Sequence, residues 1–458
     1  MRAPRTLAVG AVASALIASV VIAGYAFAPD HRPSTTPQRS AADAAVIDPA
    51  GGATPATLAE TERLIRVYED RSRTVRDAGE LTFLAQLYLQ RGRVTGDVTT
   101  YAQARAALQR ALALAPRDQS ARTLLASTQA TEHDFAGALA TSRQVLASNP
   151  ADAAALAVAG DAELETGKYQ QARASYAQLA RLKPDSAAVL VRQARIAWLS
   201  GDVATARTLA AQATAAATAA GSFGAGLAFY PAFAGQLEQE QGHYPQAAAL
   251  YTQALTAAPG WHVALAGLGR AEAAQHHDDR AVDLLRQAVD VVPQPDYLAA
   301  LGDVLAAGGD RRGAQQQYDL VTFTGRLAAV NRQLFNRQLV LFDADHAVNP
   351  AQAVALARSE LAARHDVYGW DALGWALLAD GQVAPARDAA SHALALGSPD
   401  PRILYHAGMI AAAAHDSAQA RELLSRALRT SPQFDPIQAP RARQTLADLQ
   451  DSLGQVQP

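Results

Sequence analysis

The chain has 458 residues and a formal charge of −3; half of the residues are apolar, only 6% are aromatic, and none is cysteine. The near-neutral charge argues against nucleic-acid binding, and the lack of cysteine excludes disulfides, thiolate zinc sites, iron–sulfur clusters and cysteine nucleophiles. Much of the apolar share is alanine, which forms helices well and fills cores poorly, so the composition favours closely packed helices over a sheet-rich enzyme.

Residues 1–28 have the pattern of an export signal. Arg2 and Arg5 precede an uninterrupted run of 22 small or apolar residues that ends at position 28. Such a segment is either a cleaved signal peptide or a signal anchor, because it is long enough to cross a bilayer as a helix. The two arginines would stay cytoplasmic and place the rest of the chain outside the cytoplasmic membrane, anchored through residues 7–28 or secreted after cleavage.

Residues 29–56 are rich in Pro, Ser, Thr, Ala, Asp and Gly and show no hydrophobic periodicity. This composition is typical of a flexible linker. A proline near the start of the next segment and an apolar face behind it then predict a capping helix over residues 57–79.

Residues 80–432 carry an internal repeat of about 34 residues. Prolines recur at this spacing, where a second helix must stop, and six glycines are each followed twelve residues later by an alanine. We expect each pair to lie in a helical hairpin, with the glycine of the first helix facing the alanine of the second so that the backbones approach closely. The pairs are Gly160 and Ala172, Gly235 and Ala247, Gly269 and Ala281, Gly302 and Ala314, Gly374 and Ala386, and Gly408 and Ala420.

The repeat resembles that of the tetratricopeptide repeat family. The family's opening is matched at Trp370-x2-Leu373-Gly374, and its A-x3-F segment is matched with tyrosine in place of phenylalanine at Ala172-x3-Tyr176, Ala247-x3-Tyr251 and Ala314-x3-Tyr318. The resemblance implies an all-α, right-handed solenoid of about ten helix-turn-helix repeats. Because one hairpin cannot bury its apolar side alone, the stack needs caps, and residues 433–458 are expected to form the carboxyl-terminal capping helix.

Three histidine-containing turns invite a metal hypothesis. They are His133-Asp134, His276-His277-Asp278-Asp279 and His415-Asp416. All three align with the turn inside a hairpin, so we interpret them as turns in which an aspartate caps the second helix. The alternative, a divalent site from His276 to Asp279, is disfavoured because adjacent ligands in an exposed loop lack preorganised geometry. No catalytic motif is present, and we expect no catalytic residue, cofactor or metal.

The resemblance also implies recognition of a protein or peptide in a concave groove lined by the first helices. Helical spacing from the close-packed glycines predicts which side chains project there, and they include the aromatics and arginines that dominate interface energetics. The predicted groove residues are Arg192, Arg195, Trp198, Phe229, Phe233, Arg270, Tyr368, Asp371, Trp375, Tyr405 and His406. This groove would be aromatic and mildly basic. The competing interpretation places the same aromatic side chains in the core between repeats.

Taken together, these features predict an exported, non-catalytic scaffold for a protein or peptide partner that mediates assembly or function of an envelope complex. Its amino terminus would associate with the membrane, and it would bind no nucleic acid. The alternative is a solute- or metal-binding accessory protein of a membrane transporter, and a weaker one is a regulatory subunit of an enzyme.

Overall fold

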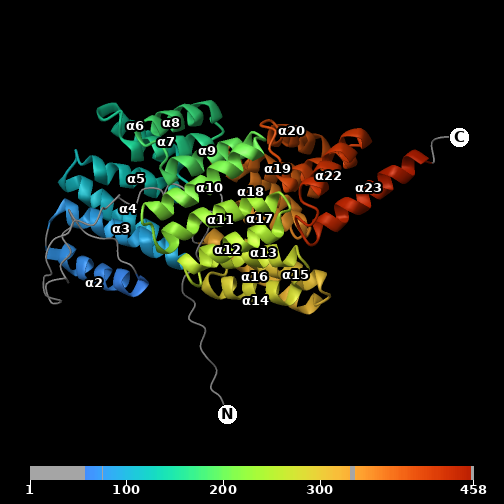
Figure 1. The fold of residues 1–458 in the computed structure, drawn as a ribbon, viewed down its shortest axis with the longest axis horizontal. Helices are drawn as coiled ribbons and strands as arrows, with labels where there is room; N and C mark the ends of the chain where they lie inside the picture. The colour runs from blue at the N-terminus through green and yellow to red at the C-terminus, as the bar shows by residue number, and fades with distance from the viewer. Residues whose placement is uncertain (1–56, 75, 331–335, 455–458) are drawn as a thin grey trace, which may run out of the picture.

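The computed structural model describes residues 57–74, 76–330 and 336–454, so the predicted signal or anchor and the predicted linker lie outside the described residues. Within these ranges the chain forms 22 α-helices, α2 to α23, and no β-strand (Figure 1). The prediction of an all-helical solenoid is confirmed. None of these helices combines the length and the apolar character needed to cross a bilayer.

Ten consecutive hairpins make up most of the described chain. Their first helices are α3 (Ala78–Thr95), α5 (Gln119–Thr131), α7 (Ala153–Glu165), α9 (Ala187–Leu199), α11 (Gly224–Glu240), α13 (His262–Ala273), α15 (Pro295–Ala307), α17 (Asn336–Asp345), α19 (Val367–Ala379) and α21 (Pro401–Ala413). Their second helices are α4 (Thr99–Leu114), α6 (Phe135–Ser148), α8 (Tyr169–Leu182), α10 (Val203–Ala219), α12 (Tyr244–Ala257), α14 (Asp278–Val291), α16 (Arg311–Val330), α18 (Pro350–Ala363), α20 (Val383–Ala393) and α22 (Ser417–Thr430). One further helix packs on each end of this series, α2 (Leu58–Thr74) on α3 and α23 (Gln438–Gly454) on α22.

The close approach of the two helices in a hairpin is present. The predicted alanine is among the nearest neighbours of Gly235 and Gly374, but the nearest neighbour of Gly160 and Gly302 is a tyrosine. A Cβ atom added to Gly160 would lie 2.5 Å from the ring of Tyr176, and one added to Gly302 would lie 2.4 Å from the ring of Tyr318. The glycine therefore faces the residue one helical turn after the alanine. A helical side chain leans toward the amino end of its helix, so the tyrosine ring covers the turn in which the alanine lies. The alanine itself is buried against the neighbouring backbone, as at Ala172, which is 0% exposed.

The histidine-containing turns are structural. His133, His276 and His415 have φ values of 64°, 61° and 60°, the left-handed conformation that glycine takes in other hairpins. Asp134 and Asp416 then cap the second helices by accepting hydrogen bonds from backbone N–H groups three residues later. This confirms the interpretation as turns for those two copies. In the part of the chain that the structure describes, no group of three or more metal-ligating side chains could hold a metal ion.

The series of hairpins curves until its carboxyl-terminal half rests on its amino-terminal half. The backbone N–H of Val367, after the α18–α19 loop, donates to the hydroxyl of Tyr169 at 2.8 Å, across 198 residues. Farther along, the hydroxyl of Tyr244 at the start of α12 lies 2.9 Å from that of Ser431 and accepts from the backbone N–H of Gln433 at 2.7 Å. Loops between hairpins thus dock on turns within hairpins one superhelical turn earlier, and the array closes on itself. In Figure 1, the carboxyl-terminal helices α18 to α20 accordingly lie beside α9 and α10.

Candidate partner-binding interior

Eight of the eleven predicted groove residues are buried and at most 7% exposed. They are Arg192, Arg195, Trp198, Phe229, Asp371, Trp375, Tyr405 and His406. The other three, Phe233, Arg270 and Tyr368, are half-buried. That these residues bind a partner stays a prediction, but the eight buried side chains do not form an open surface in this structure. The tight curvature explains this, because neighbouring hairpins and the docked loops cover positions that a more open solenoid would leave accessible.

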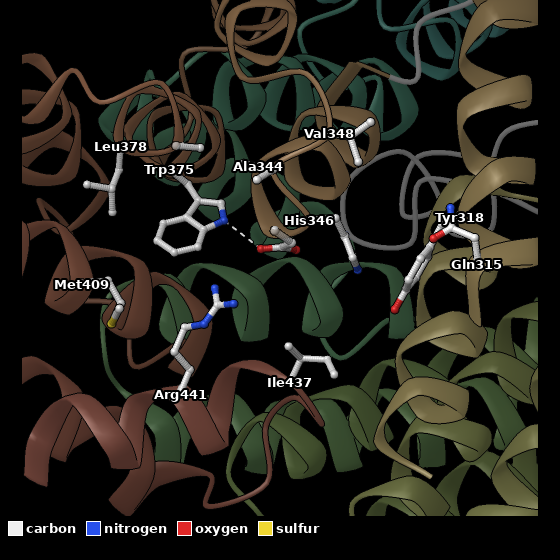
Figure 2. Close-up of a pocket in the computed structure, with 13 residues that line it drawn as sticks. Gln315, Tyr318, Ala344, His346, Val348, Trp375, Leu378, Met409, Ile437 and Arg441 are labelled. Atoms are coloured by element: carbon white, nitrogen blue, oxygen red, sulfur yellow. Dashed lines mark hydrogen bonds between the residues drawn. The ribbon is translucent and has the colours of Figure 1, made fainter. Parts of the chain in front are cut away.

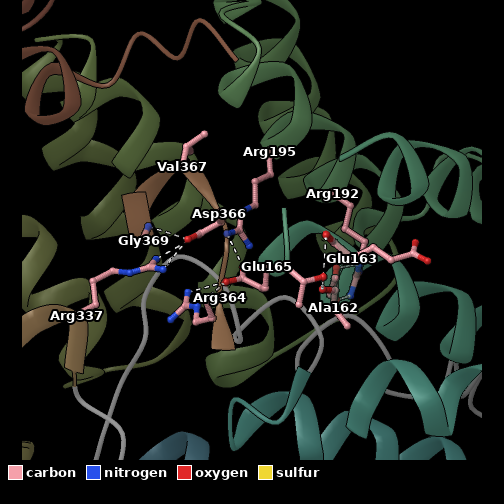
Figure 3. A network of polar contacts seen from close by, with 12 residues as sticks. Ala162, Glu163, Glu165, Arg192, Arg195, Arg337, Arg364, Asp366, Val367 and Gly369 are labelled. Atoms are coloured by element: carbon pink, nitrogen blue, oxygen red, sulfur yellow. Dashed lines mark hydrogen bonds and ion pairs between the residues drawn. The ribbon is translucent and has the colours of Figure 1, made fainter. Parts of the chain in front are cut away.

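Two of the predicted basic residues are neutralised within the protein (Figure 3). Arg192 donates from Nε and Nη2 to the two carboxylate oxygens of Asp161 at 2.9 and 2.7 Å, and the hydroxyl of Tyr176 donates to the same carboxylate at 2.7 Å. Arg195 donates to Glu165 at 2.7 Å. A buried charge is tolerated only with such partners. The expectation of a mildly basic groove is therefore wrong for these arginines.

Glu165 also joins the two halves of the array. Its Oε2 accepts from Nε and Nη2 of Arg364 at 2.9 and 2.6 Å, while its Oε1 accepts from Arg195. Arg364 is 1% exposed and its guanidinium also lies 3.3 Å from Glu360. Because Arg364 follows Glu165 by 199 residues, this buried cluster fixes where one superhelical turn ends on the previous one (Figure 3).

The amino end of α19 is tied to the same cluster. Asp366 caps the helix by accepting from the backbone N–H of Gly369 at 2.8 Å, and its two oxygens accept from Arg337 of α17 at 2.6 and 3.2 Å. Arg337 also lies 3.4 Å from Glu360 of α18. Ion pairs of Arg337 thereby connect three successive helices, α17, α18 and α19, and restrain their relative positions.

A cavity of about 610 Å³ opens between α16, α17, α19, α21 and α23 (Figure 2). Among the predicted groove residues, only Trp375 lines it. Its apolar wall also includes Leu378, Met409, Val348 and Ile437, of which Val348 is 40% exposed. The cavity therefore offers accessible apolar surface inside a curved array, the kind of concave site in which ligands bind.

The polar side of the cavity is built around Asp345. Its Oδ1 accepts from the indole N–H of Trp375 at 2.7 Å and from the amide of Gln438 at 2.6 Å. Burial raises the pKa of Asp345 to about 6, against the opposing effects of two nearby histidines and the indole hydrogen bond. The carboxylate is therefore fixed in position and only partly compensated in charge.

His346 and Tyr318 share a second carboxylate at the cavity. The Nε2 atom of His346 lies 2.9 Å from Oδ1 of Asp303, and the hydroxyl of Tyr318 donates to the same oxygen at 2.8 Å. Burial alone would lower the pKa of His346, but the hydrogen bond and charge of Asp303 outweigh it and raise the pKa. The pair is thus close to neutral when the histidine is protonated.

Trp375 is held from behind by a buried pair. Its ring stacks on that of His406 with 4.3 Å between centroids and 17° between planes. The Nδ1 atom of His406 lies 3.0 Å from both carboxylate oxygens of Asp371. Burial alone would lower the pKa of His406, but Asp371 raises it. Asp371 and His406 therefore position the tryptophan and do not face the cavity themselves.

The pKa of Arg402, an exposed arginine at the start of α21, is influenced by four carboxylates from separate elements. They are Glu240 at the end of α11, Asp345 at the end of α17, Asp400 at the cap of α21 and Asp435 in the α22–α23 loop. Burial alone would lower the pKa of Arg402, but these four charges raise it.

These carboxylates are not fully compensated. Burial, and then the charge of Asp400, raises the pKa of Glu240 to about 8. Burial also raises the pKa values of Asp400 and Asp435, and the charge of Asp303 adds to the effect on Asp435. Burial thus favours the neutral form of these carboxyl groups.

Sequence reasoning missed Arg402, Asp345 and Asp435. Arg402 lies one 34-residue repeat after Tyr368, so the helical position that selected Tyr368 also points to it. Asp345 ends a helix in the irregular part of the repeat, and Asp435 lies in a loop after the last hairpin, where no periodic signal exists. Arg270, which was predicted, is half-buried and donates to Asp296 at 3.2 Å.

The comparisons identify the repeat. A family model described as tetratricopeptide repeat matches residues 124–187, 157–222, 234–294 and 372–433. A search of curated proteins finds no match to the chain.

Three solved structures with limited similarity to this chain are the following. PilW, described as a widely conserved type IV pilus biogenesis factor, has 21% identity and a TM-score of 0.39, with 49% of this chain and 97% of that chain covered. A tetratricopeptide repeat protein from Parabacteroides merdae has 14% identity and a TM-score of 0.39, with coverage of 58% and 92%. Human IFIT1 with PPP-AAAA has 14% identity and a TM-score of 0.43, with coverage of 82% and 95%.

Proposed function

Because the chain contains tetratricopeptide repeats, a scaffold suited to protein–protein interaction, we propose that it is a non-catalytic protein that binds a protein or peptide partner. The observation that carries the proposal is the closed superhelical turn with a cavity of about 610 Å³ in its wall. Side chains from several first helices converge on this interior, so one extended ligand can contact many repeats at once.

The rigidity of the interior supports this role. Arg364 and Glu165 lock one superhelical turn onto the next, and Arg337 and Asp366 hold the helix that carries Trp375. A surface that is already ordered before binding loses little conformational entropy when a partner docks. The array thus has the properties of a preorganised binding scaffold.

The chemistry around the cavity supports a non-catalytic role. The carboxylate in its wall is already paired, because Asp345 accepts hydrogen bonds from Trp375 and Gln438.

We further propose that the protein acts outside the cytoplasmic membrane, in the assembly or function of an envelope complex. This part rests on the sequence of residues 1–28, with its two arginines and its apolar run. Mass spectrometry of the mature amino terminus distinguishes a retained anchor from a cleaved signal. A mature protein found in the cytoplasm with residues 1–28 intact would contradict export.

Site-specific photo-crosslinking in intact cells tests the binding role. A photoreactive residue at Met409, in the cavity wall, should crosslink a defined protein partner, whereas the same residue at Asp283 should not, because its side chain is 73% exposed on the second helix α14. Capture of the same proteins from both positions, or of none from Met409, would contradict the proposal. A rise in melting temperature with metal ions or small solutes alone would instead favour an accessory protein of a transporter.

A further inference from the structure

We propose that the cavity between α16, α17, α19, α21 and α23 binds an uncharged segment of the partner, with one large apolar side chain against the cavity wall and its backbone amides hydrogen-bonded to Asp345 and Arg441. The inference rests on the proposed function and deepens it, because it names the chemistry that the cavity recognises. It commits to a polypeptide whose anchoring residue is large and aliphatic or aromatic, with uncharged neighbours.

The first step is the size and polarity of the wall. Leu378, Met409 and Ile437 are half-buried, and Figure 2 shows them around the cavity. Val348 is 40% exposed, so apolar surface is accessible on more than one side. The volume of about 610 Å³ lies within the roughly 300 to 1,000 Å³ of typical ligand pockets, which leaves room for a large side chain with its backbone. Burial of such a side chain here is favourable.

The second step is that part of the wall is fixed before a ligand arrives. Trp375 is 5% exposed, its indole N–H donates to Oδ1 of Asp345 at 2.7 Å, and its ring stacks on that of His406. The hydroxyl of Thr445 donates to the sulfur of Met409 at 3.6 Å. Side chains that are already held in place lose little conformational entropy when a ligand docks on them.

The third step concerns two charged side chains of the lining that keep hydrogen-bonding capacity. Oδ1 of Asp345 accepts from Trp375 and Gln438, but its Oδ2 accepts from no residue that the structure describes. Arg441 is exposed and forms no ion pair within the described ranges. Its guanidinium is near the hydroxyl of Tyr405, whose pKa it lowers against the larger effect of burial. A free acceptor and a group with several donors match the N–H and C=O groups of a peptide backbone.

The fourth step excludes other occupants. A basic side chain would meet Arg441 and an acidic one would meet Asp345 in the same cavity, so an uncharged ligand fits best. His346 adds no net charge when it is protonated, because Asp303 lies 2.9 Å from its Nε2 atom. A free small solute would stay largely in contact with water, since Val348 and Arg441 are exposed, whereas pockets for small molecules enclose most of their ligand.

N-acetyl-leucine methylamide tests this chemistry in its smallest form, because it carries a large apolar side chain between two backbone amides and has no charge. The full chain is labelled with ¹⁵N, and the indole N–H resonance of Trp375, assigned by its loss in Trp375→Phe, reports on the cavity. Titration should shift this resonance and reach saturation. The alanine, glutamate and lysine analogues of the probe, and free leucine, should each bind at least about tenfold more weakly.

Three variants separate recognition from a structural effect. Asp345→Asn keeps an oxygen for the indole of Trp375 but offers the ligand a donor where it needs an acceptor. Arg441→Met removes the donors and keeps an apolar side chain, and Met409→Gln makes part of the apolar wall polar. Each should weaken binding of the leucine probe about fivefold. Phe323→Gln is the matched control, because that side chain is 58% exposed on α16 and does not line the cavity, and it should leave the affinity unchanged.

Several outcomes would overturn the proposal. These are no saturable shift of the Trp375 resonance, binding of the glutamate or lysine analogue as tight as that of the leucine probe, tighter binding of free leucine, or unchanged affinity in Asp345→Asn and Met409→Gln. Circular dichroism verifies that each variant is folded. The failure is separable from that of the proposed function: if crosslinking from Met409 still captures a protein, the scaffold role stands and only the chemistry assigned to the cavity is wrong.

Discussion

Adding a methyl group at Gly160 should destabilise the protein, although alanine is the better helix former. The new Cβ atom would lie 2.5 and 2.7 Å from two ring carbons of Tyr176 and 3.2 Å from the Cβ of Ser175. The Tyr176 ring cannot swing away freely, because it is 3% exposed and its hydroxyl donates to Asp161, which also holds Arg192. The overlap is therefore transmitted into the buried ion pair.

The expected size follows from two opposing effects. Overpacking of a well-packed core costs about 1 to 3 kcal/mol. Loss or distortion of the buried Tyr176 hydrogen bond adds about 1 kcal/mol or more. The higher helix propensity of alanine offsets about 1 kcal/mol of this loss of stability. We expect Gly160→Ala to lower the free energy of unfolding by about 2 kcal/mol.

Gly374 provides a matched control on another first helix. A Cβ atom there would find its nearest neighbours at 3.4 Å, which is ordinary van der Waals contact, because the facing residue is an alanine. Gly374→Ala should therefore stabilise the protein by up to about 1 kcal/mol through helix propensity alone. The two identical substitutions are expected to have opposite signs.

Urea denaturation followed by circular dichroism measures both changes. Because repeat arrays can unfold in parts, hydrogen exchange in α7 and α8 should be read beside it. If Gly160→Ala is as stable as the unmodified protein, or if Gly374→Ala is destabilised to the same extent, then the facing ring does not control the approach of the helices.

Three further predictions concern the closure and the carboxyl group of Glu240. Arg364→Met leaves Glu165 short of a buried partner and should destabilise the protein by about 3 to 5 kcal/mol, measured by urea denaturation; a loss below about 1 kcal/mol would show that the buried pair does not hold the closure. The pKa of Glu240 is raised from 4.5 to about 8, so its stabilising contribution is complete below pH 4.5 and is lost as the pH rises through 8. Glu240→Gln should therefore flatten the fall of the melting temperature over this range, and parallel curves for the two proteins would contradict the assignment. Gly242 has a φ of 73°, and a Cβ atom added there would lie 2.9 Å from the carbonyl oxygen of Thr430, whereas Gly381 has a φ of 75° and open space around it. Gly242→Ala should therefore lower the melting temperature more than Gly381→Ala. Equal shifts would argue against docking of the loop that contains Thr430.

The hairpins could be predicted because their signals are local and repeated. Small residues at fixed spacing and prolines at helix ends mark each copy, and every copy reports the same geometry. The partner of Gly160 was predicted incorrectly because spacing alone does not include the lean of a helical side chain, which places Tyr176 and not Ala172 against this glycine.

The candidate site was less predictable because it depends on closure. Helical spacing selected Arg192 and Arg195 as groove residues. Their ion-pair partners, Asp161 and Glu165, lie on the preceding first helix, 31 and 30 residues earlier, and neither separation equals the 34-residue repeat that guided the prediction. The contact between Glu165 and Arg364 joins residues that are 199 positions apart and occurs once, so the internal repeat does not predict it.

The central claim is that the array closes within one superhelical turn, and the absence of cysteine in the chain allows a direct test. Lys168, in the turn between α7 and α8, and His365, in the loop between α18 and α19, are both exposed. The turn and the loop are in contact, because a Cβ atom added to Gly167 would lie 2.5 Å from the carbonyl oxygen of His365. Cysteines at these two positions can carry spin labels whose separation is measured by pulsed electron paramagnetic resonance. We expect a single short distance, whereas a long or broad distribution would mean that the solenoid is open.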